Sequence, residues 1–495
     1  MKRYLAAAVA AVCVALWHPV AYAATPPNYA KSALKFAGKL VNLAAGDMDG
    51  DGLKDIAAVS LTGEPGKKQG RVVEIFLQKK TGGFAAKPDM SWQAARDAVV
   101  FDVGDVSGTG RSSFCYIAPD GMYAYLPSAT GYDTKPARLI SRAGVFAKPD
   151  PLDMPRWPFL VPDGGGKPEL ALIPGISTLG VFRKGGRGYE QVVGALLPVD
   201  TTYSGGPRAG ADSSLTVSHR IPAVEAAGYN SRGNPDIVMT LDDNALVYLR
   251  GKDGGYRKTP DVSFRPGLYR RPGKGPLEGA WVEPADLDGD GRLDFTVIKK
   301  EGGMAHSKSL IFVYMRRPDG SLPAKPGATI ITEGVVGPRF MDIDGDGRLD
   351  LLLPSVKVGI SNVVNILTSG QVNVDVDIYI QGKDGGFLDR PTRSKVIGFK
   401  LDLTNLTRAA PVMETGKFTR DKGSGLVVVS RDGLVSIYLP DRYSLISDRP
   451  GLDIKVESPT EMDVSDMNGD GIDDIVMTYR KSDKSAGTAN VFLSR

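Results

Sequence analysis

Short runs of β-branched and aromatic residues recur along the whole chain, separated by turns rich in glycine, aspartate and asparagine. Residues 56–59, 295–298 and 351–353 are typical runs. Each is followed by a turn and then by a further run that ends near an aromatic residue, as in residues 73–77. Runs of this length and composition, bounded by such turns, predict β-strands. We therefore expect an all-β protein.

The strand pattern is itself repeated. Turn segments of similar sequence start at positions 47, 105, 161, 228, 286, 342, 417 and 466. Each leads into a second strand, a turn, a third strand, a glycine hairpin such as residues 254–256, and a fourth strand. Four short strands per unit, repeated several times, are typical of a β-propeller. Eight turn segments predict eight blades; seven is the alternative, because three of the copies are weak.

The two ends of the chain complement each other in this pattern. Residues 490–493 read as a third strand with no fourth strand after it, and residues 32–36 form a spare strand before the first turn segment. Pairing the N-terminal strand into the last blade would close the ring and leave no long open sheet edge. We expect the ring to close in this way.

Four of the turn segments are rich in carboxylates, and we call residues 47–55, 286–294, 342–350 and 466–474 the Asp loops. Residues 286–294 place Asp at positions 1, 3, 5 and 9 and glycine at position 6. Alternate residues of an extended loop point the same way, and like charges that close disfavour ionisation unless a cation is present. A hard cation that takes six to eight oxygen ligands favours Ca²⁺ over Mg²⁺. The backbone carbonyl of Arg292 would complete the cage.

Two other interpretations of the Asp loops were weighed. An EF-hand needs a glutamate at position 12, where the 286–294 loop has Val297 and runs into a strand. A plain acidic surface turn without metal fits a single copy. Four copies with the same strand behind them favour a metal site.

Aspartate loops of this kind at the head of a four-strand repeat resemble the FG-GAP or VCBS repeats of integrin α-subunit propellers and of many bacterial exported proteins. The resemblance covers nearly all of residues 30–495 and implies about four Ca²⁺ ions. The implied side-chain ligands are Asp47, Asp49, Asp51 and Asp55; Asp286, Asp288, Asp290 and Asp294; Asp342, Asp344, Asp346 and Asp350; and Asp466, Asn468, Asp470 and Asp474. The implied backbone ligands are the carbonyls of Leu53, Arg292, Arg348 and Ile472. The four other turn segments depart from the motif and are expected to bind no metal.

The N-terminus predicts export. Lys2 and Arg3 precede an apolar stretch over residues 5–17, and residues 21–23 form a small-x-small cleavage site. We expect residues 1–23 to be a signal peptide cleaved after Ala23, and residues 24–495 to form a single propeller domain in the periplasm or outside the cell. No later stretch is long and apolar enough to span a membrane. Only Cys115 remains after cleavage, so we expect no intramolecular disulfide and a buried core thiol.

Composition and motifs narrow the function classes. Hydrophobic residues make up 42% of the 495 positions and charged residues 24%, as in folded globular proteins. The 61 basic and 57 acidic residues nearly balance, which gives no support for nucleic-acid binding. The sequence contains no nucleophile elbow, phosphate loop, zinc motif or dinucleotide fingerprint. No catalytic residue is therefore assigned.

Long connections should gather on the face opposite the Asp loops, where we expect a protein or glycan partner, because binding residues concentrate on loops of a rigid scaffold. These connections are residues 142–156, 200–219, 264–280, 300–309 and 356–374. Residues 265–274, with Tyr203, Arg208, His219 and His306, could form a basic, aromatic rim that suits an acidic polysaccharide; a solvated, proline-stiffened loop is the alternative.

Three hypotheses on function follow. The first is a non-catalytic binding or adhesion scaffold with structural calcium. The second is a polysaccharide lyase, since some lyases resemble this chain in combining eight blades with similar calcium loops. The third is a structural component of the cell envelope or of an assembly.

Overall fold

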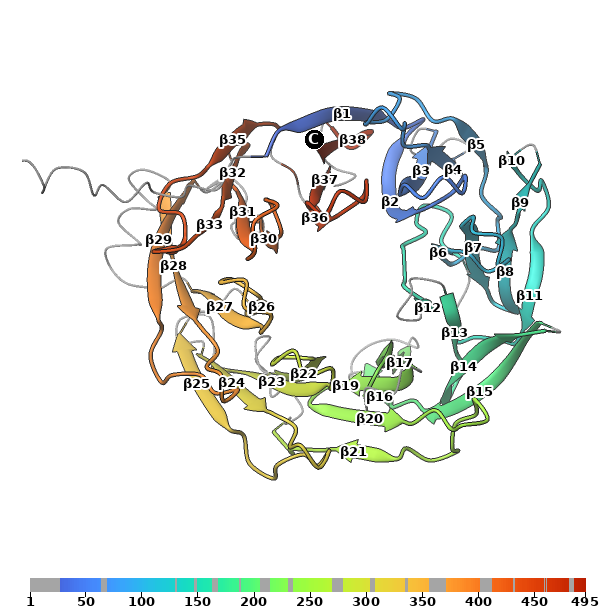
Figure 1. Cartoon of the computed structure of the whole chain (residues 1–495). Coiled ribbons are helices and arrows are strands. Elements are labelled where there is room, and N and C mark those ends of the chain that lie inside the picture. Colours follow the sequence, from blue (N-terminus) through green and yellow to red (C-terminus); the bar gives the residue numbers. More distant parts are fainter. Residues whose placement is uncertain are drawn as a thin grey trace, which may run out of the picture.

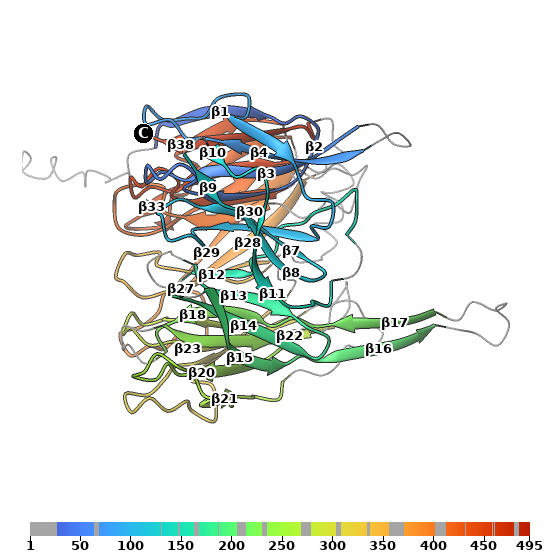
Figure 2. The ribbon, with the colours of Figure 1, turned by 90° about the vertical axis from the view of Figure 1, so that its right-hand side faces the viewer.

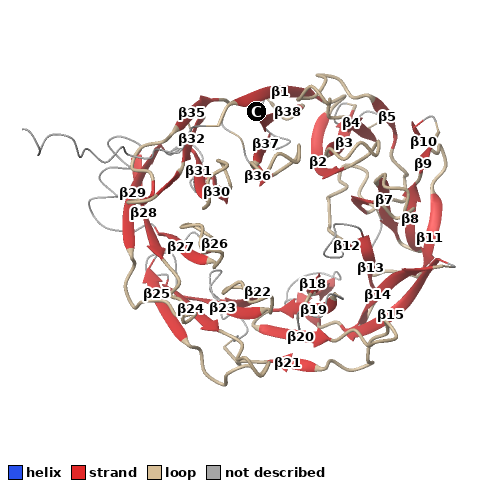
Figure 3. Cartoon of the chain, in the orientation of Figure 1, coloured by secondary structure: helices blue, strands red, loops and turns tan. Residues whose placement is uncertain are grey.

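The computed structural model describes residues 27–63, 69–129, 131–146, 149–162, 168–186, 188–204, 214–229, 235–268, 279–302, 308–333, 337–355, 371–400, 412–430, 432–457, 459, 461–479 and 485–495. These residues form β-strands, turns and loops, and they contain no helix (Figure 3). The predicted signal peptide lies outside them. In the part of the chain that is described, no helix is long and apolar enough to cross a membrane.

Eight four-stranded antiparallel sheets are arranged in a ring, as the blades of a β-propeller (Figure 1). Blades 1 to 4 are formed by β2 (Lys39–Gly46), β3 (Asp55–Thr62), β4 (Gly70–Phe76) and β5 (Met90–Gln93); β6 (Val100–Gly104), β7 (Ser113–Ala118), β8 (Gly121–Tyr125) and β11 (Ala137–Ser141); β12 (Leu160–Pro162), β13 (Pro168–Pro174), β14 (Thr178–Gly185) and β15 (Gly188–Leu196); and β18 (Ala223–Ala227), β19 (Asp236–Leu241), β20 (Asn244–Tyr248) and β21 (Val262–Phe264).

Blades 5 to 8 follow in the same order round the ring. They are formed by β22 (Gly279–Ala285), β23 (Asp294–Glu301), β24 (Lys308–Tyr314) and β25 (Ala328–Glu333); β26 (Arg339–Met341), β27 (Asp350–Ser355), β28 (Gln371–Tyr379) and β29 (Arg393–Lys400); β30 (Val412–Gly416), β31 (Gly425–Val429), β32 (Leu434–Tyr438) and β35 (Leu452–Lys455); and β36 (Glu461–Ser465), β37 (Asp474–Thr478), β38 (Thr488–Ser494) and β1 (Tyr29–Lys35). The all-β class and the number eight are thus confirmed, and seven blades is wrong.

The core lies between neighbouring blades. The second strand of a blade is covered on both faces, and every residue of β27 and of β31 is buried. This explains why these strands read as short continuous apolar runs. Between blades 4 and 5, Phe264 stacks on Phe295 with ring centroids 5.0 Å apart and meets Tyr314 edge-on at 5.0 Å. Cys115 is a buried free thiol, as expected.

The N-terminal strand closes the ring, as the sequence predicts. β1 pairs with β38 along its whole length, from Tyr29 opposite Ser494 to Lys35 opposite Thr488. The fourth strand of blade 8 therefore comes from the other end of the chain. The closure is extended by a hydrogen bond from the Phe36 N–H to the Gly487 carbonyl, 2.9 Å long.

Strand alternation fixes what each face of the disc carries. The Asp loops join the first and second strands of their blades, on the same face as the connections between third and fourth strands. That face also carries two small hairpins, β9 (Pro127–Ser128) with β10 (Gly131–Tyr132), and β33 (Pro440–Asp441) with β34 (Leu445–Ile446). A longer hairpin, β16 (Val199–Ser204) with β17 (Ser214–His219), joins blades 3 and 4 on the opposite face and projects far from the disc (Figure 2).

Candidate metal centres

The first aspartate of each Asp loop shapes the loop backbone. In the 47–55 loop, the Asp47 carboxylate accepts the N–H of Gly50 at 2.6 Å and the N–H of Gly52 at 2.9 Å. These glycines have φ of +87° and +91°, a conformation that L-residues with a side chain adopt at a cost. Asp466 accepts the corresponding Gly469 and Gly471 N–H groups at 2.7 and 2.9 Å. The motif is therefore a folded turn even before a metal is considered.

The last aspartate of each Asp loop anchors it to the blade. Asp55 is fully buried, and its carboxylate accepts the N–H of Met48 in the loop and the N–H of Gln78 just after the third strand, both at 2.7 Å. The same pair of bonds is made by Asp294, Asp350 and Asp474. The residue after the third strand is thus part of the site, and the sequence motif gave no indication of it. Its only signal is its fixed place at the end of that strand.

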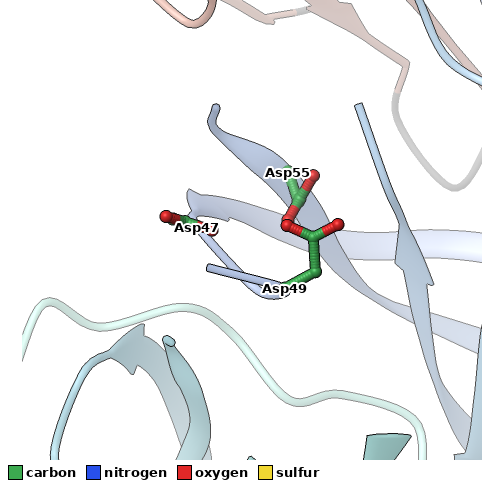
Figure 4. A group of neighbouring side chains, drawn as sticks. All are labelled: Asp47, Asp49 and Asp55. Atoms are coloured by element: carbon green, nitrogen blue, oxygen red, sulfur yellow. The ribbon is translucent and has the colours of Figure 1, made fainter. Parts of the chain in front are cut away.

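Three of the four Asp loops bring three carboxylates together. In each group, one oxygen from every aspartate lies within 4.8 Å of the others. The groups are Asp47, Asp49 and Asp55; Asp286, Asp288 and Asp290; and Asp342, Asp344 and Asp350. Figure 4 shows the first group, in which the Asp49 and Asp55 carboxylates face each other.

The electrostatics of these groups favour an added cation. Burial raises the pKa of Asp55 to about 7, and the Asp49 and Asp47 carboxylates add to the rise, while backbone N–H groups oppose it. Burial likewise raises the pKa of Asp294 and of Asp350 to about 6, against the same kind of backbone bonds. Carboxylates held this close without a cation are forced toward their protonated forms.

The donor set fits a hard cation. All the grouped side chains offer carboxylate oxygens, the ligands that Ca²⁺ and Mg²⁺ take. The Oδ1 atom of Asp286 is buried without a hydrogen-bond partner among the described residues. Burying an acceptor unpaired is costly, so this oxygen is suited to coordinate a metal. The Asp290 and Asp346 carboxylates also pair with the guanidinium groups of Arg292 and Arg348 in their own loops.

The fourth Asp loop is built differently. Among its described residues no three carboxylates come as close as in the other loops. Asn468 stands at position 3, and its amide donates to the Ser494 carbonyl at 3.0 Å. The Ser494 hydroxyl lies 3.0 Å from the Asp470 carboxylate and 3.0 Å from that of Asp474, and its single hydrogen can be donated to either. A hydroxyl near the end of the chain thus satisfies oxygens that the motif assigns to a metal.

The turn segment of blade 2 has the backbone hydrogen bonds of an Asp loop but lacks the carboxylates at positions 3 and 5. Asp105 accepts the N–H groups of Gly108 and Gly110 at 2.6 and 2.7 Å, as Asp47 does in blade 1. Positions 3 and 5 are Ser107 and Thr109, whose hydroxyls lie 2.8 Å apart. Hydrogen bonds to the charged form lower the pKa of Asp105, although burial opposes them. Hydrogen bonds to Asp105 therefore hold this turn in the shape of an Asp loop.

Neighbouring loops are hydrogen-bonded to one another round much of the ring. The N–H at position 8 of one loop donates to a carbonyl at position 1 or 2 of the loop in the preceding blade. The described bonds are Ser112 to Asp47 at 2.6 Å, Lys54 to Met467 at 2.9 Å, Asp473 to Lys417 at 2.7 Å, Ser424 to Asp342 at 2.8 Å and Leu349 to Leu287 at 2.7 Å. The loops are therefore not independent turns.

The basic, aromatic rim expected from the sequence falls mostly on residues that the structure does not describe. Residues 269–274, Arg208 and His306 lie outside the described residues, and only the backbone of Tyr203 is described, in β16. His219 ends β17, and its Nδ1 atom is buried without a partner among the described residues. The rim stays a prediction.

The fold and its loops define an eight-bladed β-propeller with carboxylate-rich turns on one face. The FG-GAP-like repeat family matches residues 229–297 and 286–353, which include the Asp loops of blades 5 and 6. This part of the chain therefore matches the FG-GAP-like repeats, as the sequence motif predicts. No protein of curated function matches the sequence.

Several solved structures are similar to this chain over most of its length. An Agrocybe aegerita lectin that recognises non-reducing terminal N-acetylglucosamine is 12% identical, with 94% of this chain and 96% of that chain covered and a TM-score of 0.39. Sqt1 from Chaetomium thermophilum is 12% identical, with 93% and 96% covered and a TM-score of 0.41. The V. cholerae biofilm matrix protein Bap1 is 12% identical, with 97% and 89% covered and a TM-score of 0.24. Similarities this distant carry no argument about function.

Proposed function

We propose that this protein is an exported binding or adhesion scaffold whose β-propeller is stabilised by Ca²⁺ ions in its Asp loops. The observation that carries the metal assignment is the convergence of three carboxylates in each of three loops, within 4.8 Å. The FG-GAP-like repeats support it, because their aspartate loops resemble calcium loops. If the signal peptide is cleaved, only Cys115 remains, and bound ions would then stabilise a chain that has no intramolecular disulfide.

The proposed ligands are those of the Asp loops. The described groups supply three carboxylates each, and the backbone carbonyls of Leu53, Arg292 and Arg348 would add a further oxygen to their loops. A fourth ion would use Asp466, Asn468, Asp470, Asp474 and the Ile472 carbonyl. An ion that binds only the folded loop stabilises the fold by about 2.7 kcal/mol when free metal is about a hundredfold above its dissociation constant. Extracellular calcium modules bind in the range of about 10⁻⁴ to 10⁻³ M, so the gain depends on the calcium supply.

Metal analysis combined with thermal unfolding tests this proposal. Protein dialysed against Ca²⁺ at several times the dissociation constant should hold three to four equivalents in excess of the dialysate, about one per Asp loop. Chelator should lower the melting temperature, and Ca²⁺ should restore it better than Mg²⁺, because the loops offer many oxygens in a flexible arrangement. A metal content near zero, or a melting curve indifferent to chelator, would leave the loops as hydrogen-bonded turns like that of blade 2.

We place the protein or glycan partner on the face opposite the Asp loops. The support is the β16–β17 hairpin, which projects from that face, and the apolar residues at its base. Leu196, Val199 and Val217 are 84%, 42% and 50% exposed. Exposed apolar residues that cluster on a protruding element favour a binding surface. A glycan array and a pull-down with a Val199→Ser/Val217→Ser variant as control should show binding that depends on this hairpin.

Export is the remaining part of the proposal. Residues 1–23 have the charge, apolar core and cleavage site of a signal peptide. Mass spectrometry of the protein from a bacterial secretion strain should show a chain that begins at Ala24. Recovery of intact Met1 in the cell interior would overturn the assignment to the periplasm or exterior.

A further inference from the structure

Blades 2 and 7 each carry a small extra hairpin on the face of the Asp loops. In both, a hairpin of two very short strands joins the third strand to the fourth, β9–β10 in blade 2 and β33–β34 in blade 7. Each hairpin begins with proline, at Pro127 and Pro440, and lies on the face of the Asp loops. Each belongs to the blade that follows an Asp loop with three grouped carboxylates, Asp47 to Asp55 or Asp342 to Asp350.

In blade 2 an arginine fills the space between hairpin and loop. The Arg111 guanidinium donates to the Ser128 carbonyl at 2.9 Å and to the Gly131 carbonyl at 3.3 Å, both in the hairpin. Its Nε donates to the Met48 carbonyl of the neighbouring Asp loop at 3.3 Å. The guanidinium lies over the Tyr132 ring, 5.8 Å from its centroid. The Tyr132 hydroxyl donates to the Met48 carbonyl at 2.9 Å.

Part of this backbone arrangement recurs in blade 7, although its hairpin turn is one residue longer. Ser112 in blade 2 donates its N–H to the Asp47 carbonyl at 2.6 Å, and Ser424 in blade 7 donates to the Asp342 carbonyl at 2.8 Å. With these bonds aligned, Met48 corresponds to Ile343. The hairpin registers, which pair Gly131 with Ser128 and Leu445 with Asp441, then align Ser128 with Asp441, Gly131 with Leu445 and Tyr132 with Ile446.

Blade 7 lacks the side chains that fill this space in blade 2. The position of Arg111 is Gly423, and a Cβ atom built there would lie 2.4 Å from the Ile343 carbonyl oxygen, so no side chain fits. The position of Tyr132 is Ile446, which is buried in the core. What remains is a pocket of about 430 Å³, lined by Ile343, Asp344, Asp421, Lys422, Pro440, Asp441, Arg442 and Leu445. This volume is in the range of small-ligand pockets.

The pocket-lining residues Ile343, Asp441 and Leu445 correspond to the three residues whose carbonyls hold the Arg111 guanidinium in blade 2. We propose that this pocket binds the guanidinium group of an arginine side chain that a partner protein supplies. The partner's arginine would take the place that Arg111 occupies within the chain in blade 2. The site lies on the face of the Asp loops and is separate from the partner surface proposed above.

The chemistry of the lining supports a guanidinium more than a simple amine. The fork of N–H donors on a guanidinium can reach several acceptors at once, which a lysine ammonium does with less fixed geometry. In place of Ser128 the pocket has Asp441, which adds a carboxylate for a charge-assisted bond. Asp421 is exposed at the same pocket, so three carboxylates, with Asp344, face the two basic side chains of the lining, Lys422 and Arg442.

The hairpin itself favours a protein partner. Tyr443, in the turn between β33 and β34, is 67% exposed, and aromatic residues are enriched in the energetic centres of protein interfaces. Leu445 has a φ of +64°, which is unfavourable for a leucine. Its counterpart in blade 2 is a glycine, Gly131, which tolerates positive φ. Backbone strain of this kind is concentrated at binding sites.

Methyl NMR of the calcium-equilibrated full chain tests the proposal, with N-acetyl-arginine amide as probe and N-acetyl-lysine amide as the matched cation. The arginine probe should give saturable shifts of the Ile343 and Leu445 methyl groups, and the lysine probe should bind at least fivefold more weakly. Asp441→Asn should weaken the arginine probe about tenfold, the effect of losing one hydrogen bond to a charged group. This variant keeps the Oδ1 acceptor for the Tyr443 and Ser444 N–H groups, so the hairpin should fold.

A variant in blade 2 provides a second, independent experiment. Arg111→Gly should open the corresponding space there, so that the arginine probe also shifts the Met48 methyl group and raises the melting temperature of the variant. In the unchanged protein Met48 should not respond. No saturable shift at Ile343 and Leu445, or equal affinity for both probes, would overturn the proposal. If Arg111→Gly fails to fold, the proposal is tested by the affinity of the Asp441→Asn variant for the arginine probe.

Discussion

The Asp loops of blades 5 and 6 should bind metal in a coupled way, although they lie in separate blades. Two metal sites in separate sheets, far apart in sequence, would ordinarily make additive contributions to the free energy of unfolding. The structure links them directly, because the Leu349 N–H of one loop donates to the Leu287 carbonyl of the other at 2.7 Å. A metal that fixes the 286–294 loop also fixes this acceptor for the 342–350 loop.

The expected size of the coupling is that of one backbone hydrogen bond. Such a bond contributes about 1 kcal/mol net, which is a factor of about five in a dissociation constant. Asp288→Ala should therefore weaken Ca²⁺ binding at the intact 342–350 loop about fivefold, and Asp344→Ala should act equally on the 286–294 loop, because linkage is reciprocal. Isothermal titration of the metal-free single and double variants measures both effects.

A variant of the loop in blade 1, on the opposite side of the ring, distinguishes coupling between the two metal sites from a general loss of stability. Asp49→Ala empties the loop of blade 1, which has no direct bond to either loop among the described residues. Its effect on stability should add to that of Asp344→Ala within about 0.5 kcal/mol. The reasoning would be refuted if the Asp288→Ala and Asp344→Ala pair were equally additive.

A pair of glycine variants tests the contact between the loops without removing a ligand. Gly289 has φ of +72°, and a Cβ atom there would lie 2.7 Å from the Gly347 carbonyl of the neighbouring loop. Gly469 occupies the same loop position with φ of +77°, and nothing lies within 4 Å. Both alanine variants pay about 1–2 kcal/mol for the left-handed conformation. Gly289→Ala should cost more and weaken the coupling, and equal urea midpoints would contradict the proposed contact.

The remaining predictions concern protons, charge and anchoring. In chelator, the free energy of unfolding should fall as the pH rises from about 4 to about 7, because the raised pKa of Asp55 makes the folded state bind more protons in this window. Urea titrations with saturating Ca²⁺ should lack this fall, and an unchanged fall would contradict it. Asp288→Ala should lower the metal content by about one equivalent, whereas Asp105→Ala should leave it unchanged; equal losses would refute the distinction. Arg316→Ala should cost about 2–3 kcal/mol in urea unfolding, because its buried guanidinium bonds loop carbonyls of two blades; a cost below 0.5 kcal/mol would count against this. Ser494→Ala should enlarge the drop in melting temperature that chelator causes, because a metal then no longer competes with the hydroxyl for these carboxylates; an equal drop would contradict that role.

The sequence predicts those features of the fold that rest on local pattern. Continuous apolar runs such as residues 351–353 identify the buried second strands, because both faces of these strands are covered. The spare strand at residues 32–36 predicts the closure, because an unpaired edge is costly and the last blade lacks one strand. The Asp motif predicts the turn, because each Asp and Gly in it has a local hydrogen bond or a local φ to satisfy.

Contacts between blades escape this kind of prediction. The Gln78 amide donates to the Met467 carbonyl across 389 positions of sequence, and no local pattern indicates that pairing. Gly289 and Gly469 both occupy position 4 of an Asp loop and both have positive φ. At Gly289 the neighbouring loop also leaves no room for a Cβ atom, and the sequence does not reveal this second reason for glycine. The pocket of blade 7 likewise appears only when its hairpin is compared with that of blade 2.

The loop at residues 466–474 shows why a matching motif does not guarantee a matching site. Its aspartates at positions 1, 5 and 9 match those of the other loops, and Asn468 stands at position 3. In blades 1 and 6 the residue after the third strand is a glutamine, Gln78 or Gln381, whose N–H binds the anchoring aspartate. In blade 8 the corresponding N–H belongs to Ser494, the last residue of β38, whose short side chain turns back onto Asp470 and Asp474. A hydroxyl within hydrogen-bond distance of both carboxylates competes with a cation for the same oxygens. We therefore infer that this loop, alone among the four, is stable without metal and binds it most weakly.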